Sequence, residues 1–297
     1  MPAPTTPRSA SPILASSSWC IIGGGNMAGA IVRGAIASGQ IGPDRFVIVE
    51  PEESKRLEFG RAGIRVFATA SEGARAVEEI ESPASSGHFL LAVKPQVFPR
   101  VEADLRGLLD SAPRRVVSIM AGLSTSLLQS ALGTSARVIR LMPNTPAQIR
   151  RGTTAWAPGS SAVAGDEAAT IELFETLGMT VRLEERLLDA FTAVAGSGPA
   201  YLFYLAESMI TAAVREGIEP NAASAIVRSV LAGASELLLT KSEQTPLELR
   251  KSVTSKGGTT EAAISVFDSN KVNDILTRAI AEATARGKQL SNEPPNR

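Results

Sequence analysis

One short stretch of the sequence limits the possible fold more than any other. Residues 19–39 read WCIIGGGNMAGAIVRGAIASG: an apolar run of strand length, three glycines, then the apolar spacing of an amphipathic helix. Gly23, Gly25 and Ala28 match the pattern G-x-G-x-x-A. The first glycine permits a tight turn, the second lets backbone approach a pyrophosphate, and the small third residue packs helix against strand. The stretch predicts a βαβ unit with a phosphate site at the helix start.

The rest of the first half continues this alternation, which is typical of a parallel sheet with helices on both faces. The expected strands are 19–22, 46–50, 64–66, 89–93, 115–119, 138–141, 153–157 and 180–183. The expected helices are 26–38, 52–60, 71–79, 96–109, 124–132 and 166–177. Residues 19–184 are therefore predicted to form a Rossmann-like, doubly wound α/β domain.

After Glu184 the strand-like runs stop and long segments rich in alanine and leucine follow, so residues 185–290 are predicted to be all helical. The expected helices are 199–216, 222–240, 260–268 and 273–288. The first two carry apolar residues on nearly every face, which requires burial all round. A unit of this size cannot enclose both alone, so we expect subunit contacts, with a symmetric homodimer as the default.

The chain ends and the composition narrow the function further. Residues 1–18 are rich in Pro, Ser and Thr and are expected to be a disordered leader, and residues 291–297 a loose tail. No apolar run approaches the length of a membrane span, and with one free thiol the chain is expected to be cytoplasmic. A net charge of zero and 4% aromatic residues argue against nucleic acid and membrane partners.

A single histidine, His88, and a single cysteine, Cys20, make imidazole or thiolate chemistry implausible. The same scarcity argues against a metal site built from several His or Cys ligands, and none is predicted. Catalysis is therefore expected to depend on other groups.

The glycine-rich turn is interpreted as a dinucleotide site. Gly23, Gly24 and Gly25 would lie against the pyrophosphate, and the free amides of Asn26, Met27 and Ala28 would face its oxygens. The alternative is a purely structural glycine-rich turn, which the strand–turn–helix context and the second strand that follows make less favourable.

Glu50 ends the second expected strand, about 20 residues after the turn, where an acidic side chain accepts hydrogen bonds from an adenosine ribose and repels a 2′-phosphate. This favours NADH. Two alternatives stay open: Lys55 and Arg56 follow closely and could hold a 2′-phosphate, and Glu50 could be only a solvated strand end. Both NADPH and NADH are therefore retained as cofactors.

Three unusual loops follow strands whose carboxyl ends share one sheet edge, where ligands of open α/β sheets bind. They are Lys94-Pro95-Gln96, Met120-Ala121-Gly122 and the proline-stiffened 142–146, which includes Asn144. We expect them to surround ribose and nicotinamide. Alternatively, Pro95 only starts a helix and Lys94 is a solvated cap.

A second candidate site precedes an apolar helical pattern in the helical half, where residues 253–261 read VTSKGGTTE. Gly257 and Gly258 can adopt unusual dihedral angles, and Thr259 and Thr260 follow at a helix start, so the segment is suited to bind a small anion on backbone amides. The alternative is that one threonine is merely a helix cap.

These motifs resemble a known family. GGGNMAGAI, AVKPQ, SIMAG, LMPNTP, GSGPAYLF and TSKGGTTEAAI, in this order, are similar to those of Δ1-pyrroline-5-carboxylate reductase, the last enzyme of proline biosynthesis. The resemblance covers residues 19–290. It implies reduction of 1-pyrroline-5-carboxylate to L-proline by NADPH or NADH, a Rossmann domain joined to a helical dimerisation domain, and homodimers that often assemble into rings such as decamers.

The resemblance also implies residue roles. Thr260 matches the threonine near the ring nitrogen, Glu243 matches an acidic residue that orients substrate, and the loop of Gly257, Gly258, Thr259 and Thr260 would take the substrate carboxylate. Lys256 departs from the family, which usually has proline there. Ala92, Val93, Lys94 and Pro95, with Met120, Ala121 and Gly122, would line the cofactor.

The chemistry fits the scarcity of histidine, because a protonated cyclic imine is already electrophilic and the nicotinamide carries the difficult step. Two other functions fit the sequence less well. A 2-hydroxy-acid dehydrogenase should have a lysine in the segment GSGPAYLFY, which has none. A nucleotide-sensing regulator would account for the first motif but not for the GGTT loop or Glu243.

Overall fold

The structure, a computed structural model, describes residues 11–80, 87–109 and 113–292 and divides into two compact units. The first comprises the chain up to Gly196 together with the segment from Ala283 onward, and the second runs from Ser197 to Glu282. The predicted boundary at residue 184 falls earlier than this division. The difference arises because residues 185–196 pack on the sheet of the first unit, where Leu188 joins a small core with Ala155 and Ala157.

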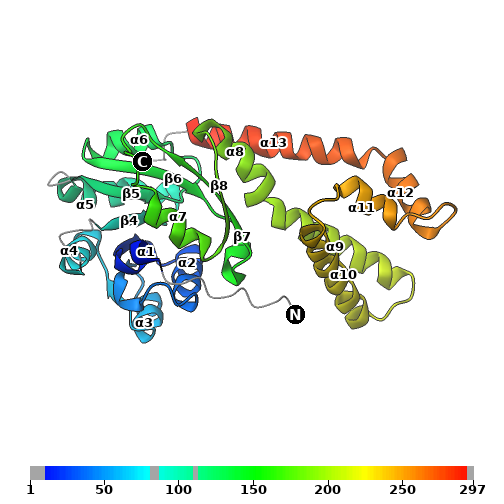
Figure 1. Ribbon diagram of the computed structural model, residues 1–297, viewed down its shortest axis with the longest axis horizontal. Coiled ribbons are helices and arrows are strands. Elements are labelled where there is room, and N and C mark those ends of the chain that lie inside the picture. The colour runs from blue at the N-terminus through cyan, green and yellow to red at the C-terminus, as the bar shows by residue number, and fades with distance from the viewer. Residues whose placement is uncertain (1–10, 81–86, 110–112, 293–297) are drawn as a thin grey trace. The chain divides into compact units, whose positions relative to one another are not determined.

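The first unit is built on an eight-stranded sheet with the order β3-β2-β1-β4-β5-β6-β7-β8. Strands β4 to β8 are labelled in Figure 1. Strands β1 to β6 are parallel, β7 runs antiparallel to β6, and β8 is parallel to β7. This confirms the predicted Rossmann-like α/β fold. The strands are β1 (Trp19–Ile22), β2 (Phe46–Val49), β3 (Arg65–Phe67), β4 (His88–Leu91), β5 (Arg114–Ser118), β6 (Ala136–Met142), β7 (Gly152–Pro158) and β8 (Gly178–Arg182).

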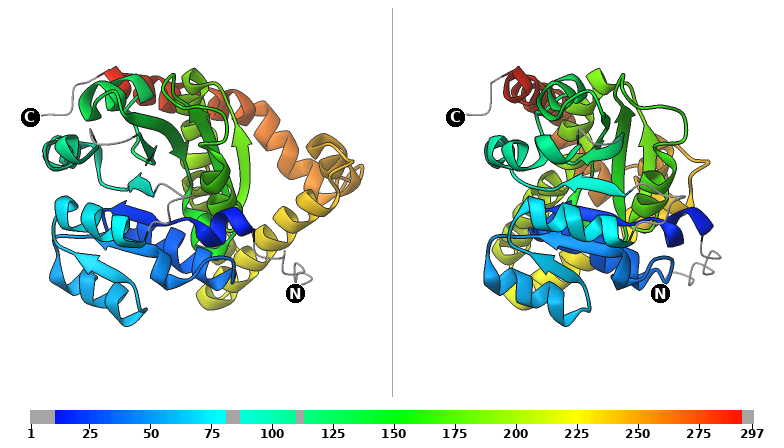
Figure 2. Two further views of the ribbon diagram at one scale, coloured as in Figure 1. Left: turned by 60° about the vertical axis from the view of Figure 1, so that its left-hand side comes forward. Right: turned by 90° about the vertical axis from the view of Figure 1, so that its left-hand side faces the viewer.

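Helices cover both faces of this sheet (Figure 2) because successive strand side chains point to opposite sides. Ile21 lies in one core, which also includes residues of α2, α3 and α7, and its neighbour Cys20 lies in the other, with residues of α4, α5 and α6. The helices are α2 (Asn26–Ala37), α3 (Glu53–Arg61), α4 (Ala70–Ile80), α5 (Phe98–Leu109), α6 (Thr125–Leu132), α7 (Ala168–Glu175) and α8 (Leu188–Phe191). Single 3₁₀ turns are η1 (Pro43–Arg45), η2 (Pro95–Val97), η3 (Thr145–Ile149) and η4 (Glu185–Leu187), and Thr192–Gly196 forms a π turn.

The N-terminal segment differs from its prediction. Residues 1–10 lie outside the described part of the chain, but α1 (Pro12–Ser16) is a short helix whose Leu14 is fully buried in the core. The Ser11 side chain accepts from the Ile13 amide, and its hydroxyl donates to Glu172 Oε2 of α7 at 2.6 Å. The predicted disordered leader is therefore wrong for residues 12–16. The signal was present as a helix-capping serine followed by proline and then by the apolar residues 13–15.

The second unit is helical, as predicted. It contains α9 (Gly198–Arg215), α10 (Pro220–Thr240), α11 (Pro246–Ser252), α12 (Thr259–Ser269) and the first part of α13 (Val272–Asn292). Sequence analysis missed α11, although Thr245 and Glu248 form a complete capping box at its start. The last turns of α13 belong to the first unit, and the predicted tail from residue 291 lies partly in this helix, with residues 293–297 outside the described part of the chain.

The helices of the second unit expose much apolar surface. Of the described residues, only Ala223 and Val227 are buried in this unit, whereas Phe203 and Leu239 are 68% and 70% exposed. Helix α10 is long and apolar enough by length and composition to cross a membrane. The neighbouring helices of this unit also expose apolar side chains, so α10 is not exceptional within it. Exposed apolar area of this extent is typical of a subunit interface.

Candidate active site

The glycine-rich turn joins β1 to α2, and its glycines differ in how closely other atoms of the protein pack against them. Gly23 has φ +106°, and its amide donates to the Val49 carbonyl of β2 at 2.8 Å. A Cβ on Gly23 would lie 2.9 Å from the Ala92 carbonyl oxygen, whereas a Cβ on Gly25 would meet nothing within 4 Å. The backbone is thus packed on one side of the turn and open at Gly25.

Helix α2 begins directly at this open side. Its N-cap is Gly25, which has no side chain, so the first-turn amides of Asn26, Met27 and Ala28 are not capped by their own N-terminal residue. An anion at this position would meet these N–H groups and the positive end of the helix dipole. The residues present therefore fit the pyrophosphate of a dinucleotide.

A cavity of about 330 Å³ opens beside the turn. It is bounded by the ends of β1, β2 and β4 and by the start of α5, so it lies at the carboxyl edge of the parallel sheet. Of the predicted cofactor residues, those that line it are Gly23, Gly25, Glu50, Ala92, Val93 and Lys94. Pro95 begins η2 immediately after Lys94.

Glu50 is one of two acidic residues that line this cavity, with Asp104, and its carboxylate is fixed by backbone amides. It is only 7% exposed. Its Oε2 accepts from the Gly24 amide at 2.8 Å, and its Oε1 accepts from the Glu52 amide at 3.0 Å. The side chain is therefore not a freely solvated strand end, and it links the end of β2 to the glycine-rich turn.

The loop after β5 lies at the same sheet edge but is not among the residues that line the cavity in the described chain. The Met120 side chain is buried in the core, Ala121 is exposed, and Gly122 has φ +77°. A Cβ on Gly122 would lie 3.1 Å from the Leu290 carbonyl oxygen, so the end of α13 packs directly on this loop. Any ligand contact by Met120 would have to use its backbone.

Asn144 lies at the start of η3, and its side chain forms hydrogen bonds to the π turn and to β7. Its Nδ2 donates to the Ala195 carbonyl at 3.0 Å, and its Oδ1 accepts from the Thr153 amide at 2.8 Å. The side chain is mostly buried. These bonds fix the shape of the proline-stiffened loop, so its role in cofactor binding stays a prediction.

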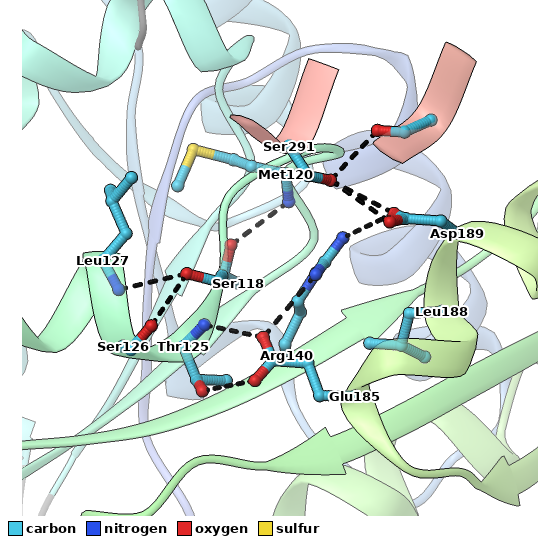
Figure 3. A network of polar contacts seen from close by, with 12 residues as sticks. Ser118, Met120, Thr125, Ser126, Leu127, Arg140, Glu185, Leu188, Asp189 and Ser291 are labelled. Atoms are coloured by element: carbon cyan, nitrogen blue, oxygen red, sulfur yellow. Dashed lines mark hydrogen bonds and ion pairs between the residues drawn. The ribbon is translucent and has the colours of Figure 1, made fainter. Parts of the chain in front are cut away.

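A buried ionic network supports the loop after β5 (Figure 3). Arg140 of β6 pairs with Glu185 at 3.5 Å and with Asp189 of α8 at 3.4 Å. Glu185 accepts from both the amide and the hydroxyl of Thr125, the first residue of α6, at 2.7 and 2.6 Å. Asp189 accepts from the Ser291 hydroxyl of α13 at 3.2 Å. Sequence reasoning missed this network, whose members are far apart in the chain.

The second candidate site lies at the start of α12. Gly257 has φ +72°, and the N-cap Gly258 provides no side-chain cap. The Gly257 amide donates to Glu261 Oε2 at 2.6 Å, and the Gly258 amide donates to the Ser255 carbonyl at 3.0 Å. Two predicted donors thus already have acceptors, one in the loop and one in the first turn of α12, so the first-turn amides of Thr259 and Thr260 are the better candidates for an anion. Glu261 was not anticipated.

The other predicted residues of this unit are exposed. Glu243 lies in the turn between α10 and α11, and among the described residues no hydrogen bond or ion pair joins it to Thr260. Lys256 is exposed in the loop before Gly257. The predicted cofactor residues belong to the first unit, and these residues belong to the second.

The single histidine and the single cysteine are structural. Cys20 lies in β1 and His88 lies at the start of the neighbouring strand β4. The His88 ring stacks on the Trp19 ring, with centroids 4.4 Å apart. Burial, and secondarily the charge of Arg115, lower the pKa of His88 to about 3, and burial raises the pKa of the Cys20 thiol. Neither group titrates near neutral pH. In the described part of the chain, no cluster of three or more His, Cys, Asp or Glu side chains could hold a metal ion.

The parallel sheet, the uncapped helix start and the cavity at the sheet edge define a dinucleotide-binding α/β protein joined to a helical unit. Comparison with known families agrees: residues 18–122 match the family described as NADP oxidoreductase coenzyme F420-dependent, and residues 185–290 match pyrroline-5-carboxylate reductase dimerisation. The chain belongs to the pyrroline-5-carboxylate reductase family. The resemblance seen in the motifs is thereby confirmed.

Individual relatives cover nearly the whole chain. Pyrroline-5-carboxylate reductase 2 of Bacillus subtilis is 33% identical over 92% of this chain and 94% of that protein, and the Arabidopsis thaliana reductase is 32% identical over 91% and 94%. Among solved structures, a pyrroline-5-carboxylate reductase from Coxiella burnetii is 31% identical with a TM-score of 0.83, covering 93% of this chain and 99% of that chain.

Proposed function

We propose that this protein reduces 1-pyrroline-5-carboxylate to L-proline by hydride transfer from NADPH or NADH, the last step of proline biosynthesis. The observation that carries the proposal is similarity to pyrroline-5-carboxylate reductases along almost the full length of the chain. The geometry supports it, because one chain holds a phosphate-binding turn and a second helix start suited to a carboxylate. The direct test is oxidation of NADPH and NADH by the imine.

The residues of this chain position the reactants. The amides of Asn26, Met27 and Ala28 hold the pyrophosphate, and the amides of Thr259 and Thr260 hold the substrate carboxylate. A bound reduced cofactor would supply the hydride for the imine carbon, the ring carbon that is doubly bonded to nitrogen, so that the protonated C=N bond becomes an amine and the nicotinamide is left oxidised. The Thr260 hydroxyl orients the ring nitrogen, and Glu243 sets the orientation of the substrate.

Assembly is part of the proposal. The helical region matches a dimerisation family, and its helices expose apolar side chains, so the chain forms a homo-oligomer. We infer a homodimer as the basic unit, assembled into a larger ring such as a decamer, in the cytoplasm. Sedimentation at several protein concentrations would distinguish dimer from ring.

Replacing Thr260 by alanine is expected to lower kcat on the imine by about tenfold, since one hydrogen bond to the reacting nitrogen contributes about 1.5 kcal/mol. Cofactor affinity, measured by the fluorescence of the reduced cofactor, should not change. Ser269→Ala is the matched control, because it removes a hydroxyl at the opposite end of the same helix, where it donates to the Val266 carbonyl and accepts from Asn270 Nδ2. Wild-type kcat in Thr260→Ala would exclude the role.

Replacing Glu261 by glutamine is expected to lower the KM for the imine about fivefold. The carboxylate lies at the start of α12 and repels a second carboxylate there, whereas glutamine keeps an acceptor for the Gly257 amide without the charge. Asp268→Asn makes the same change of charge at the far end of α12 and should leave KM unaltered. A rise in KM in Glu261→Gln would instead mean that the charged side chain is needed to shape the loop.

A further inference from the structure

We propose that this chain binds NADH in preference to NADPH and that the Glu50 carboxylate sets this preference. The inference deepens the proposed function, on which it rests for the identity of the ligand as a reduced nicotinamide dinucleotide. Sequence reasoning left the choice open because Glu50 could have been a solvated strand end and two basic residues follow it. The structure supplies the position of all three groups.

The first argument is that Glu50 is preorganised. Its carboxylate is almost fully buried and is held by the amides of Gly24 and Glu52 at 2.8 and 3.0 Å. A carboxylate offers about four acceptor positions, so about two remain. Because Glu50 lines the cavity together with Gly25, these positions can serve the two adjacent hydroxyl groups of an adenosine ribose. The side chain loses no further rotational freedom when it does so.

The second argument concerns a 2′-phosphate at the same place. It would bring a second negative group against a carboxylate that cannot turn away without breaking its bonds to the Gly24 and Glu52 amides. Like charges in a partly buried site repel strongly because little water screens them. NADPH would therefore need a cation nearby that is available to its phosphate.

The two basic residues that follow Glu50, Lys55 and Arg56, already have partners within the chain. Lys55, which also lines the cavity, pairs through Nζ with Glu52 Oε2 at 2.7 Å, and the two side chains are 43% and 54% exposed. Arg56 Nη1 donates to the backbone carbonyls of Glu50 and Pro51, at 2.8 and 2.6 Å. Arg56 thus stabilises the chain turn that presents Glu50. The other cations lining the cavity, Lys94 and Arg100, follow β4, which lies two strands away from β2 in the sheet.

The test is to measure the dissociation constants of NADH and NADPH for the full-length protein in the absence of any imine. The fluorescence of the reduced cofactor reports binding. We expect NADH to bind at least about tenfold more tightly than NADPH. In Glu50→Gln the ratio of the two dissociation constants should fall to about one, because the repulsion is lost together with part of the ribose interaction. Glu53→Gln is the matched control: it removes a charge in the first turn of α3 outside the cavity and should keep the wild-type ratio.

A second measurement uses the wild-type protein alone and does not depend on the folding of a variant. AMP and adenosine 2′,5′-bisphosphate differ only in the 2′-phosphate, and AMP should displace bound NADH at a concentration about tenfold lower. Equal or tighter binding of NADPH or of the bisphosphate, or an unchanged ratio in Glu50→Gln, would overturn the inference.

These binding experiments, together with the assay of cofactor oxidation by the imine, separate this inference from the proposed function. A protein that prefers NADH in binding but reduces no imine would contradict the proposed reaction and leave the role of Glu50 intact. A protein that reduces the imine with equal or higher affinity for NADPH would uphold the reaction and refute the preference.

Discussion

Replacing Gly25 by alanine is expected to weaken binding of NADH or NADPH by about a hundredfold, with no loss of folding stability. A Cβ at this position meets no protein atom within 4 Å and therefore fits the folded protein. It stands, however, where the pyrophosphate must approach the amides of Asn26, Met27 and Ala28. The dissociation constant is measured by cofactor fluorescence, and the free energy of unfolding by urea denaturation.

The same substitution two residues earlier provides the matched control. Gly23→Ala puts a side chain on a residue at φ +106° and brings its Cβ to 2.9 Å from the Ala92 carbonyl oxygen. Strain and crowding together should lower the free energy of unfolding by about 2–4 kcal/mol. We therefore expect Gly23 to be required by the fold and Gly25 to be required by the ligand. Tight cofactor binding in Gly25→Ala would mean that the open side of the turn is not the phosphate site.

The turn could be predicted from the sequence because its signals are local. A buried strand, a tight turn and an amphipathic helix each follow from a few consecutive residues, and the parallel order of β1, β2 and β4 follows from their alternation with helices. The predicted strands lie within about two residues of those observed, because apolar runs define a strand's centre better than its ends.

Contacts between distant segments could not be predicted in the same way. Nothing near Arg140 indicates that it pairs with Glu185 and Asp189, and nothing near Ser11 indicates its bond to Glu172 of α7. Glu261 was missed for another reason: an acidic residue in the first helical turn has an ordinary role in stabilising the helix dipole. Only the structure shows that its carboxylate accepts a hydrogen bond from the Gly257 amide.

Replacing Arg140 by methionine is expected to lower the free energy of unfolding by about 3 kcal/mol. The guanidinium side chain is 5% exposed and lies between the carboxylates of Glu185 and Asp189, which are 29% and 15% exposed. Methionine fills a similar volume but leaves these two negative groups close together without their cation. Thermal denaturation at one fixed protein concentration measures the effect, because oligomer stability depends on concentration.

Two further variants show that the loss comes from the buried charges. Arg186→Ala removes a cation whose pair with Glu184 is 73% and 67% exposed, and it should change stability by less than about 0.5 kcal/mol. Combining Arg140→Met with Glu185→Gln and Asp189→Asn removes all three charges and should regain most of the loss, since the uncompensated carboxylates are gone. Glutamine at position 185 keeps one oxygen that can accept a hydrogen bond from Thr125 at the start of α6. An effect of Arg140→Met no larger than that of Arg186→Ala would show that the network does not support this part of the fold.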